Sequence, residues 1–303
     1  ICSDSSGGSK GDTGRVHQLR PLRSASVVLA CAVALTGCTT PTPDAPKVTS
    51  ASAPSLRSAV LGAAVPDTSP AVDLRAHSAT EAMPAGTLAG RLIVIDPGHN
   101  GVWTKKLGKL VPSGNGRKKA CNSSGTATNS GYAEHAYNWA QANTLAEELR
   151  ARGAEVLLTR SDDSSQGPCV NLRSTLANAR GADVLISLHA DGSYSKKARG
   201  FHVIISTTMV GGAALEAESK ALAKDLRSAL ETGTAMPRST YVGKGTALSP
   251  RSDIATLNLS KRVAVMMEMG NMRHPKDAAL LKSAKFRTQA AVALADGIAS
   301  YLG

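Results

Sequence analysis

Aromatic residues are scarce in this chain. Its 303 residues include two Phe, two Trp and five Tyr, so a hydrophobic core must be built mainly from Val, Leu, Ile, Ala and Met. The formal net charge of +12 would attract polyanions. The basic residues, however, are not interleaved with the aromatic side chains on which nucleic-acid bases stack. We therefore expect no nucleic-acid partner.

A hydrophobic run long enough to cross a membrane is also missing near the N-terminus. The apolar run at residues 25–35 is too short to span a bilayer. It follows three arginines between residues 15 and 23, an order typical of a secretory signal peptide. The run ends in Leu-Thr-Gly-Cys at residues 35–38, which resembles the bacterial lipobox, whose cysteine is lipidated after cleavage before it. We expect lipid on Cys38; the alternative is an ordinary signal peptide that ends at a cysteine by chance.

Composition divides the chain into three parts. Residues 1–37 are interpreted as an upstream extension and a lipoprotein signal peptide, with Val16 as a candidate for the true start if initiation is non-standard. Residues 38–88, which carry the lipidated cysteine, are rich in Ala, Pro, Ser and Thr and are predicted to form a flexible tether. Residues 89–303 lack an internal repeat and have the length of one domain. We expect an exported, lipid-anchored protein in the cell wall space, at the outer face of the cytoplasmic membrane.

Cysteine is rare as well. Of the five cysteines, Cys2 and Cys31 would be lost with the signal region and Cys38 would carry the lipid. Cys121 and Cys169 then remain as a single pair in an oxidising compartment. We expect them to form a disulfide, and the alternative is two free thiols.

Three apolar runs end at residues that carry chemistry. Residues 93–99 read Ile-Val-Ile-Asp-Pro-Gly-His, and residues 183–191 deliver His189 in the same manner. A third run, residues 263–271, delivers Glu268, whose carboxylate would be costly to bury without a partner. Ligands bind at the carboxyl ends of strands in open α/β sheets, so these side chains are predicted to share one site.

The rest of residues 89–303 alternates between strand and helix patterns. We predict an α/β single domain, a twisted and mainly parallel sheet with helices on both faces. The predicted strands are residues 92–95, 155–159, 183–188, 201–205 and 263–267, and the predicted helices are residues 134–152, 170–180, 213–230 and 277–302. In the first of these helices, Ala136, Trp139, Ala140, Leu145 and Leu149 are predicted to face the sheet.

Four short motifs, taken together, resemble one enzyme family. They are Asp-Pro-Gly-His at 96–99, Gly-Tyr-Ala-Glu at 131–134, Ser-Leu-His-Ala-Asp at 187–191 and Met-Glu-Met-Gly-Asn at 267–271. In this order they resemble the zinc-dependent N-acetylmuramoyl-L-alanine amidases of the type 3 family, over residues 91–302. The cysteine pair and residues 128–131 look most like the compact mycobacterial wall amidases among them.

The resemblance implies that His99, Glu134 and His189 bind Zn²⁺ and that Glu268 is the catalytic base. Two imidazoles and one carboxylate suit a zinc site that keeps an open position for water. The implied reaction is hydrolysis of the amide between N-acetylmuramic acid and the first L-alanine of the stem peptide, which makes the chain a peptidoglycan hydrolase. The implied partners are peptidoglycan and muropeptides, with the membrane reached through the lipid, and we expect a monomer.

Several alternatives stay open at this point. Glu134 could serve only as an acidic residue at a helix N-terminus, with His135 as the ligand instead. Glu268 could belong to a structural ion pair, and Asp191 could either orient a ligand histidine or form a turn. A wall-binding lipoprotein of the same fold without turnover, or a zinc carboxypeptidase acting on the stem peptide, would use similar residues.

A basic loop at residues 103–121 has no assigned role. It gathers six cationic side chains, Lys105, Lys106, Lys109, Arg117, Lys118 and Lys119. We interpret it either as an arm that faces or closes the site, or as a solvated charged loop.

Overall fold

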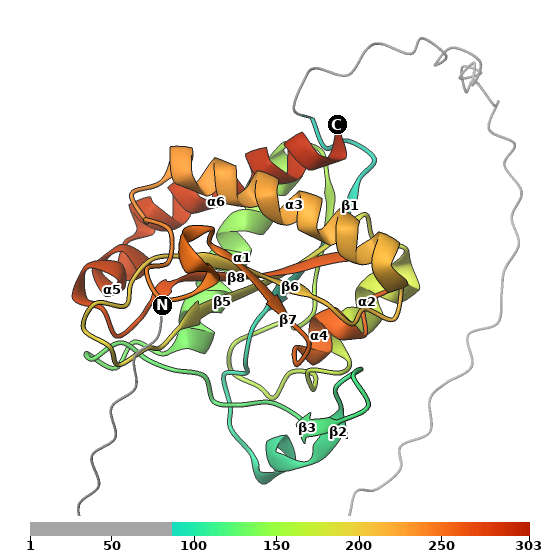
Figure 1. Cartoon of the computed structure of the whole chain (residues 1–303), viewed down its shortest axis with the longest axis horizontal. Helices are drawn as coiled ribbons and strands as arrows, with labels where there is room; N and C mark the ends of the chain where they lie inside the picture. The colour runs from blue at the N-terminus through green and yellow to red at the C-terminus, as the bar shows by residue number, and fades with distance from the viewer. Residues whose placement is uncertain (1–86) are drawn as a thin grey trace, which may run out of the picture. The chain divides into compact units, whose positions relative to one another are not determined.

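A computed structural model of the chain describes residues 87–303. The predictions for residues 1–37, for Cys38 and for nearly all of the 38–88 tether lie outside this part. The described residues form one six-stranded sheet in the order β4-β1-β5-β8-β6-β7, together with a small two-stranded sheet (Figure 1). No helix within residues 87–303 is both long and apolar enough to cross a membrane.

The predicted strands and helices are present with somewhat different bounds, and the structure adds three short strands, Leu110–Pro112, Lys118–Ala120 and Leu248–Arg251, and a short helix, Ala255–Asn258, that were not predicted. The strands are β1 (Leu92–Pro97), β2 (Leu110–Pro112), β3 (Lys118–Ala120), β4 (Glu155–Leu158), β5 (Val184–Asp191), β6 (His202–Ser206), β7 (Leu248–Arg251) and β8 (Val263–Asn271). The helices are α1 (Glu134–Ala151), α2 (Arg173–Arg180), α3 (Gly212–Gly233), α4 (Ala255–Asn258), α5 (Pro275–Lys282) and α6 (Ala284–Leu302). Short 3-10 helices lie at Lys105–Gly108 and Gly243–Gly245.

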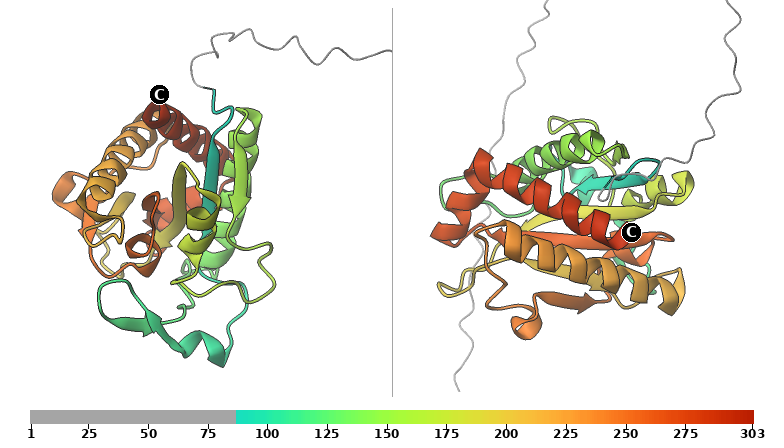
Figure 2. Two further views of the ribbon diagram at one scale, coloured as in Figure 1. Left: turned by 90° about the vertical axis from the view of Figure 1, so that its right-hand side faces the viewer. Right: turned by 90° about the horizontal axis from the view of Figure 1, so that it is seen from above.

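The sheet is mainly parallel and is covered on both faces, as predicted. Strands β4, β1, β5 and β8 run parallel to one another, whereas β6 runs antiparallel to β8 and parallel to β7. Helices α1, α3 and α6 cover one face, and α3 and α6 lie side by side there (Figure 2). The short helices α2 and α4 cover a smaller apolar cluster on the other face.

Side chains alternate between these two faces along each strand. On β5, Val184, Ile186 and Leu188 pack toward α1, α3 and α6, while Leu185 packs toward α2 and α4. Successive strand residues point to opposite faces, so the even-numbered and odd-numbered residues of β5 belong to different layers. The face under α2 and α4 is covered by only two short helices, which leaves room for a cavity near the strand ends.

Two predicted helices differ from the structure. The helix predicted over residues 277–302 is two helices, because Ser283 ends α5 and caps α6 by accepting a hydrogen bond from the Phe286 backbone. The predicted buried face of α1 is wrong in its first half. Tyr137 and Asn138 are buried there in place of Ala136, Trp139 and Ala140, which are only half-buried.

Cys121 and Cys169 form the predicted disulfide. Cys121 is fully buried and packs with Leu107 and Val111 beneath the hairpin of β2 and β3, so the bridge anchors the basic loop to the start of α2. The bridged residues are 48 positions apart in the chain. Closing a loop of this length considerably lowers the conformational entropy of the unfolded chain.

Removing this bridge is expected to destabilise the protein. Replacing both cysteines by alanine should lower the free energy of unfolding by about 4 kcal/mol on the chain-entropy account. Urea unfolding of the oxidised protein, the reduced protein and the double variant would measure the difference. The reduced wild-type protein should unfold at the same urea concentration as the double variant. Equal stability of all three samples would contradict the expectation.

Candidate active site

The alternation along β5 and β8 places two chemical groups side by side. His189 follows Leu185 and Ser187 on the face under α2 and α4, and Glu268 follows Ala264 and Met266 on that same face. His189 and Glu268 are also paired in register across the two parallel strands. The sheet thus presents an imidazole and a carboxylate as neighbours near the carboxyl ends of its strands.

The third strand brings His99 to the same place. His99 lies just past β1 and has a φ of 60°, the left-handed conformation that residues other than glycine adopt rarely. The Arg173 guanidinium holds this turn by donating to the backbone oxygens of Pro97 (2.8 Å) and His99 (2.6 Å). Arg173 also forms a 2.7 Å ion pair with Asp96, and both side chains are buried.

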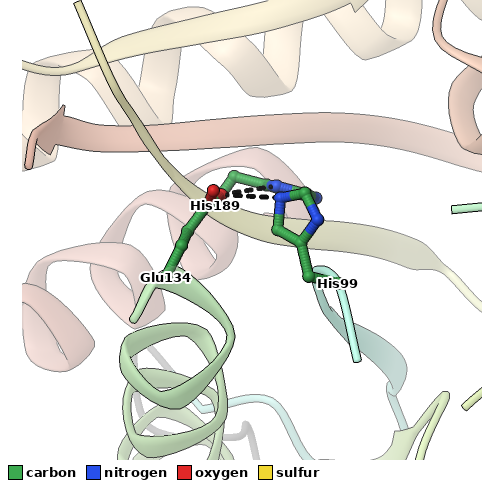
Figure 3. Close-up of side chains that lie close together, drawn as sticks. All are labelled: His99, Glu134 and His189. Carbon is green, nitrogen blue, oxygen red and sulfur yellow. Dashed lines mark hydrogen bonds and ion pairs between the residues drawn. The ribbon is translucent and has the colours of Figure 1, made fainter. Parts of the chain in front are cut away.

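Two imidazoles converge on one carboxylate oxygen (Figure 3). Glu134 Oε1 lies 3.0 Å from His99 Nε2 and 2.9 Å from His189 Nδ1. The ligand atoms of the three residues all lie within 4.8 Å of one another. Glu134 is the first residue of α1, so the third member of the cluster comes from the start of a helix and not from the end of a strand.

Hydrogen bonds from the backbone fix these side chains. The Thr126 N–H donates to Glu134 Oε2 (2.9 Å), and the Ala190 N–H donates to Glu134 Oε1 (3.2 Å). His99 Nδ1 lies 2.9 Å from the Ser123 carbonyl oxygen, which fixes its N–H there and directs Nε2 at the cluster. The site is therefore preorganised.

Glycine is required where the backbone passes the imidazole of His189. A Cβ atom on Gly98 would lie 2.2 Å from this ring, far inside van der Waals contact. A Cβ on Gly125 would lie 2.7 Å from Glu134 Oε2, and this glycine also has a φ of +74°. The glycine of the Asp-Pro-Gly-His motif thus makes room for a ring on the neighbouring strand.

The three groups of the cluster shift one another's pKa values. Burial raises the pKa of Glu134, but the two histidines outweigh it and hold this pKa well below its usual range. Burial opposes protonation of His99, yet the Glu134 carboxylate raises its pKa; for His189 burial dominates and lowers the pKa. Glu134 is thus ionised, and one histidine remains neutral and available as a ligand.

Glu268 lines a cavity of about 420 Å³ together with all three residues of the cluster. Its Oε2 atom is buried and has no hydrogen-bond partner in the described part of the chain. Burial, followed by the carboxylates of Glu134 and Asp191, raises its pKa well above the usual range. A carboxylate held in this way is suited to exchange a proton with a molecule in the cavity.

The alternatives from the sequence can now be placed. His135 lies outside the cluster and points to Asp163 instead, with 2.9 Å between Nδ1 and Oδ2. Asp191 accepts a hydrogen bond from the Tyr241 hydroxyl (2.8 Å) rather than orienting a histidine of the cluster. Within the basic loop, Lys119 lines the cavity and donates to the backbone oxygen of Asp253 (2.7 Å).

Two buried groups near the site were not predicted from the sequence. Arg173 supports the turn that carries His99, and a lone arginine in a predicted helix gives no signal of such a role. His202 is paired in register with Glu268 on the strand opposite to His189 and is buried. Burial lowers its pKa to about 4, so His202 is neutral beside Glu268.

The Asp96–Arg173 pair predicts how stability depends on pH. Burial raises the pKa of Asp96, but Arg173, Ser187 and Thr159 together lower it below its value in the unfolded chain. The ionised pair therefore contributes stability above about pH 4, which is lost as pH falls through the lower folded pKa.

Replacing Asp96 by asparagine tests this dependence. The substitution should cost about 3–5 kcal/mol at pH 7, because it leaves the Arg173 charge buried and unpaired. The free energy of unfolding of the variant should also fall less steeply than that of the wild type as pH decreases from about 5 to 2. Denaturant unfolding across this range would measure both effects, with Asp225→Asn on α3 as the matched control. If the variant lost stability at acidic pH as steeply as the wild type, the role given to the Asp96–Arg173 pair would be contradicted.

Comparison with known proteins identifies the family. The model of the Amidase_3 family, described as N-acetylmuramoyl-L-alanine amidase, matches residues 93–300. N-acetylmuramoyl-L-alanine amidase Rv3717 of Mycobacterium tuberculosis is 41% identical over 226 residues, which cover 74% of this chain and 91% of that protein.

Solved structures agree with the sequence comparison. The N-acetylmuramyl-L-alanine amidase Ami1 of Mycobacterium smegmatis has a TM-score of 0.68 and 40% identity, covering 72% of this chain and 99% of that one. The apo form of Ami1 from Mycobacterium abscessus has the same TM-score and 37% identity, covering 71% of this chain and 100% of that one. The predicted family is confirmed: the chain belongs to the Amidase_3 family of N-acetylmuramoyl-L-alanine amidases.

Proposed function

We propose that this chain hydrolyses the amide between N-acetylmuramic acid and L-alanine of peptidoglycan, using a zinc ion held by His99, Glu134 and His189. The observation that carries the proposal is the convergence of two imidazole nitrogens on one ionised carboxylate, in a cavity that also contains Glu268. Family membership supplies the bond that is cut.

The donor set fits zinc. Zinc sites in hydrolases commonly use three protein ligands of the imidazole and carboxylate types and leave a fourth position open. Donor atoms bound tetrahedrally to zinc lie about 3.4 Å apart, given bonds of about 2.0–2.1 Å. The contacts of 2.9 and 3.0 Å around Glu134 Oε1 are close to this spacing.

A zinc ion bound at these residues would supply Lewis acidity to polarise the amide carbonyl and to lower the pKa of the attacking water. Glu268 accepts the proton of the attacking water and then donates it to the leaving nitrogen of alanine. The raised pKa of Glu268 makes its carboxylate a stronger base in the first step and favours the protonated acid needed in the second. The Ser123 carbonyl oxygen accepts the hydrogen of His99 Nδ1 and so leaves Nε2 of that ring free to bind the metal.

Export as a lipoprotein anchored through Cys38, with residues 38–88 as the tether and residues 89–303 as a monomeric catalytic domain, would place the site within reach of the wall. The disulfide supports an oxidising compartment. Metabolic labelling with a radioactive fatty acid, compared between the wild type and Cys38→Ala, tests the anchor.

Digestion of purified muropeptides tests the reaction itself. The zinc-loaded protein should release the intact stem peptide and the peptide-free glycan, identified by mass spectrometry. Release of a single C-terminal amino acid would indicate a carboxypeptidase instead. Binding to the wall without any released fragment would indicate a wall-binding protein without turnover, and either outcome would overturn the proposal.

A further inference from the structure

A second cavity lies beside the candidate active site. It measures about 590 Å³, and residues on three separate segments line it. Each segment also contributes a residue to the first cavity, a few positions earlier in the chain. Thr126, Gly192 and Glu268 line the first cavity, and Asn129, Ser193 and Arg273, which follow them, line the second. A molecule bound in the first cavity therefore has the second one next to it.

The second cavity is cationic. Its lining includes Lys196, Arg273 and Lys276 and, among residues 87–303, contains no acidic residue. The nearest carboxylate with a described contact to the lining is Asp277, which is buried and already paired with Arg199 at 3.0 Å. The cavity therefore carries an uncompensated positive charge, unlike the first cavity, which holds the carboxylates of Glu134 and Glu268.

Arg273 is positioned as an anion receptor. Its guanidinium stacks over the Tyr194 ring at 5.0 Å, and Tyr194 itself is 81% exposed. The Nη1 atom of Arg273 donates to Asn129 Oδ1 (3.5 Å), whereas its Nε atom is buried and has no hydrogen-bond partner in the described part of the chain. An unsatisfied guanidinium edge beside a cavity matches the two oxygens of a carboxylate.

The surrounding backbone holds this arrangement in place. The Asn271 side chain accepts hydrogen bonds from the backbone N–H groups of Ser193 (3.0 Å) and Arg273 (3.0 Å). Asn129 Nδ2 donates to the Arg273 backbone oxygen (3.3 Å). The three segments are thus tied together, and the cavity is preorganised for a ligand.

We propose that this cavity binds a free carboxylate of the stem peptide beyond its first alanine. The inference rests on the proposed function, because the alanine amide must sit beside Glu268 for the rest of the peptide to reach Arg273. The stem peptide bears carboxylates, whereas the glycan arm carries none next to the intact amide. The cationic lining therefore selects the peptide arm.

The first test compares two synthetic muramoyl peptides that differ only in whether the carboxylates beyond alanine are free or amidated. Amidation should raise KM of the wild type about tenfold and change kcat by less than about twofold. Arg273→Gln and Lys196→Gln should raise KM for the free-carboxylate substrate and abolish most of this difference. Lys220→Gln, an exposed lysine on α3, is the matched control and should retain it. An equal KM for both substrates in the wild type would overturn the inference.

A binding experiment separates this inference from the proposed reaction. Calorimetric titration with the isolated stem peptide, free or amidated, needs no turnover. Tighter binding of the free peptide by the wild type, lost in Lys196→Gln, supports the cavity even if no muropeptide is cleaved, in which case only the proposed function fails. Inorganic phosphate that binds more tightly than the peptide would overturn the inference in favour of a phosphate polymer.

Discussion

Replacing Glu268 by glutamine is expected to lower kcat on muropeptides by about 10²- to 10⁴-fold, the usual contribution of general acid–base catalysis. Glutamine keeps the shape of the side chain but cannot accept a proton from water. Zinc content and KM should stay at the wild-type level, since Glu268 is not among the three converging ligand residues. Steady-state kinetics and atomic absorption measure these quantities, and Glu147→Gln on the exposed side of α1 is the control.

Stability distinguishes this catalytic role from a structural ion pair. The pKa of Glu268 is raised in the folded protein, so its ionised form destabilises the fold above the unfolded pKa. Glutamine removes that cost, and the metal-free variant should therefore unfold at the same or a higher denaturant concentration at pH 7. A residue that held the fold through an ion pair would instead lose stability on substitution. Retained turnover together with lowered stability would refute the assignment.

The buried strands could be predicted because they are continuous apolar runs. Strands β1, β5 and β8 pack on both faces, so their sequences contain little else than apolar residues before the site. Strand β7 could not be predicted in this way. It is four residues long, contains Pro250 and Arg251, and lies at the edge of the described sheet, where it pairs with β6. Its strand conformation depends on a partner that the local sequence does not specify.

The face of α1 shows why apolar periodicity can mislead near a functional site. Asn138 and Gln141 are buried because they donate to the backbone oxygens of Gly98 (3.3 Å) and Arg287 (3.1 Å). Trp139 is instead half-buried beneath the guanidinium of Arg160, at 5.0 Å. Polar residues with partners elsewhere in the fold can thus occupy the face that hydrophobicity assigns to apolar ones.

The site was predictable where it follows from strand ends, and not where it depends on neighbours in space. His99, His189 and Glu268 each follow an apolar run, so their meeting at one sheet edge could be expected. The position of Glu134 came from family resemblance, because its helix does not by itself point to the histidines. The supporting contact of Arg173 to the His99 turn joins residues 74 positions apart and has no local pattern.

Removing one residue of the converging cluster is expected to abolish zinc binding and activity together. His189→Ala takes away a nitrogen 2.9 Å from Glu134 Oε1, leaving two of the three converging groups. Bound zinc would stabilise the transition state by several kcal/mol. The variant's kcat should therefore fall by at least about 10²-fold, in proportion to the loss of zinc. Chelation of the wild type should have the same effect, and added zinc should restore the wild type but not the variant.

Two neighbouring residues provide the sharpest form of this test. Glu134→Ala should lose zinc and activity, whereas His135→Ala should keep both, because His135 points to Asp163 and away from the cluster. Zinc bound only to the folded state also raises stability, so thermal unfolding with and without chelator should differ for the wild type and His135→Ala but not for Glu134→Ala. Full zinc content and turnover in Glu134→Ala would show that the metal, if any, is held elsewhere.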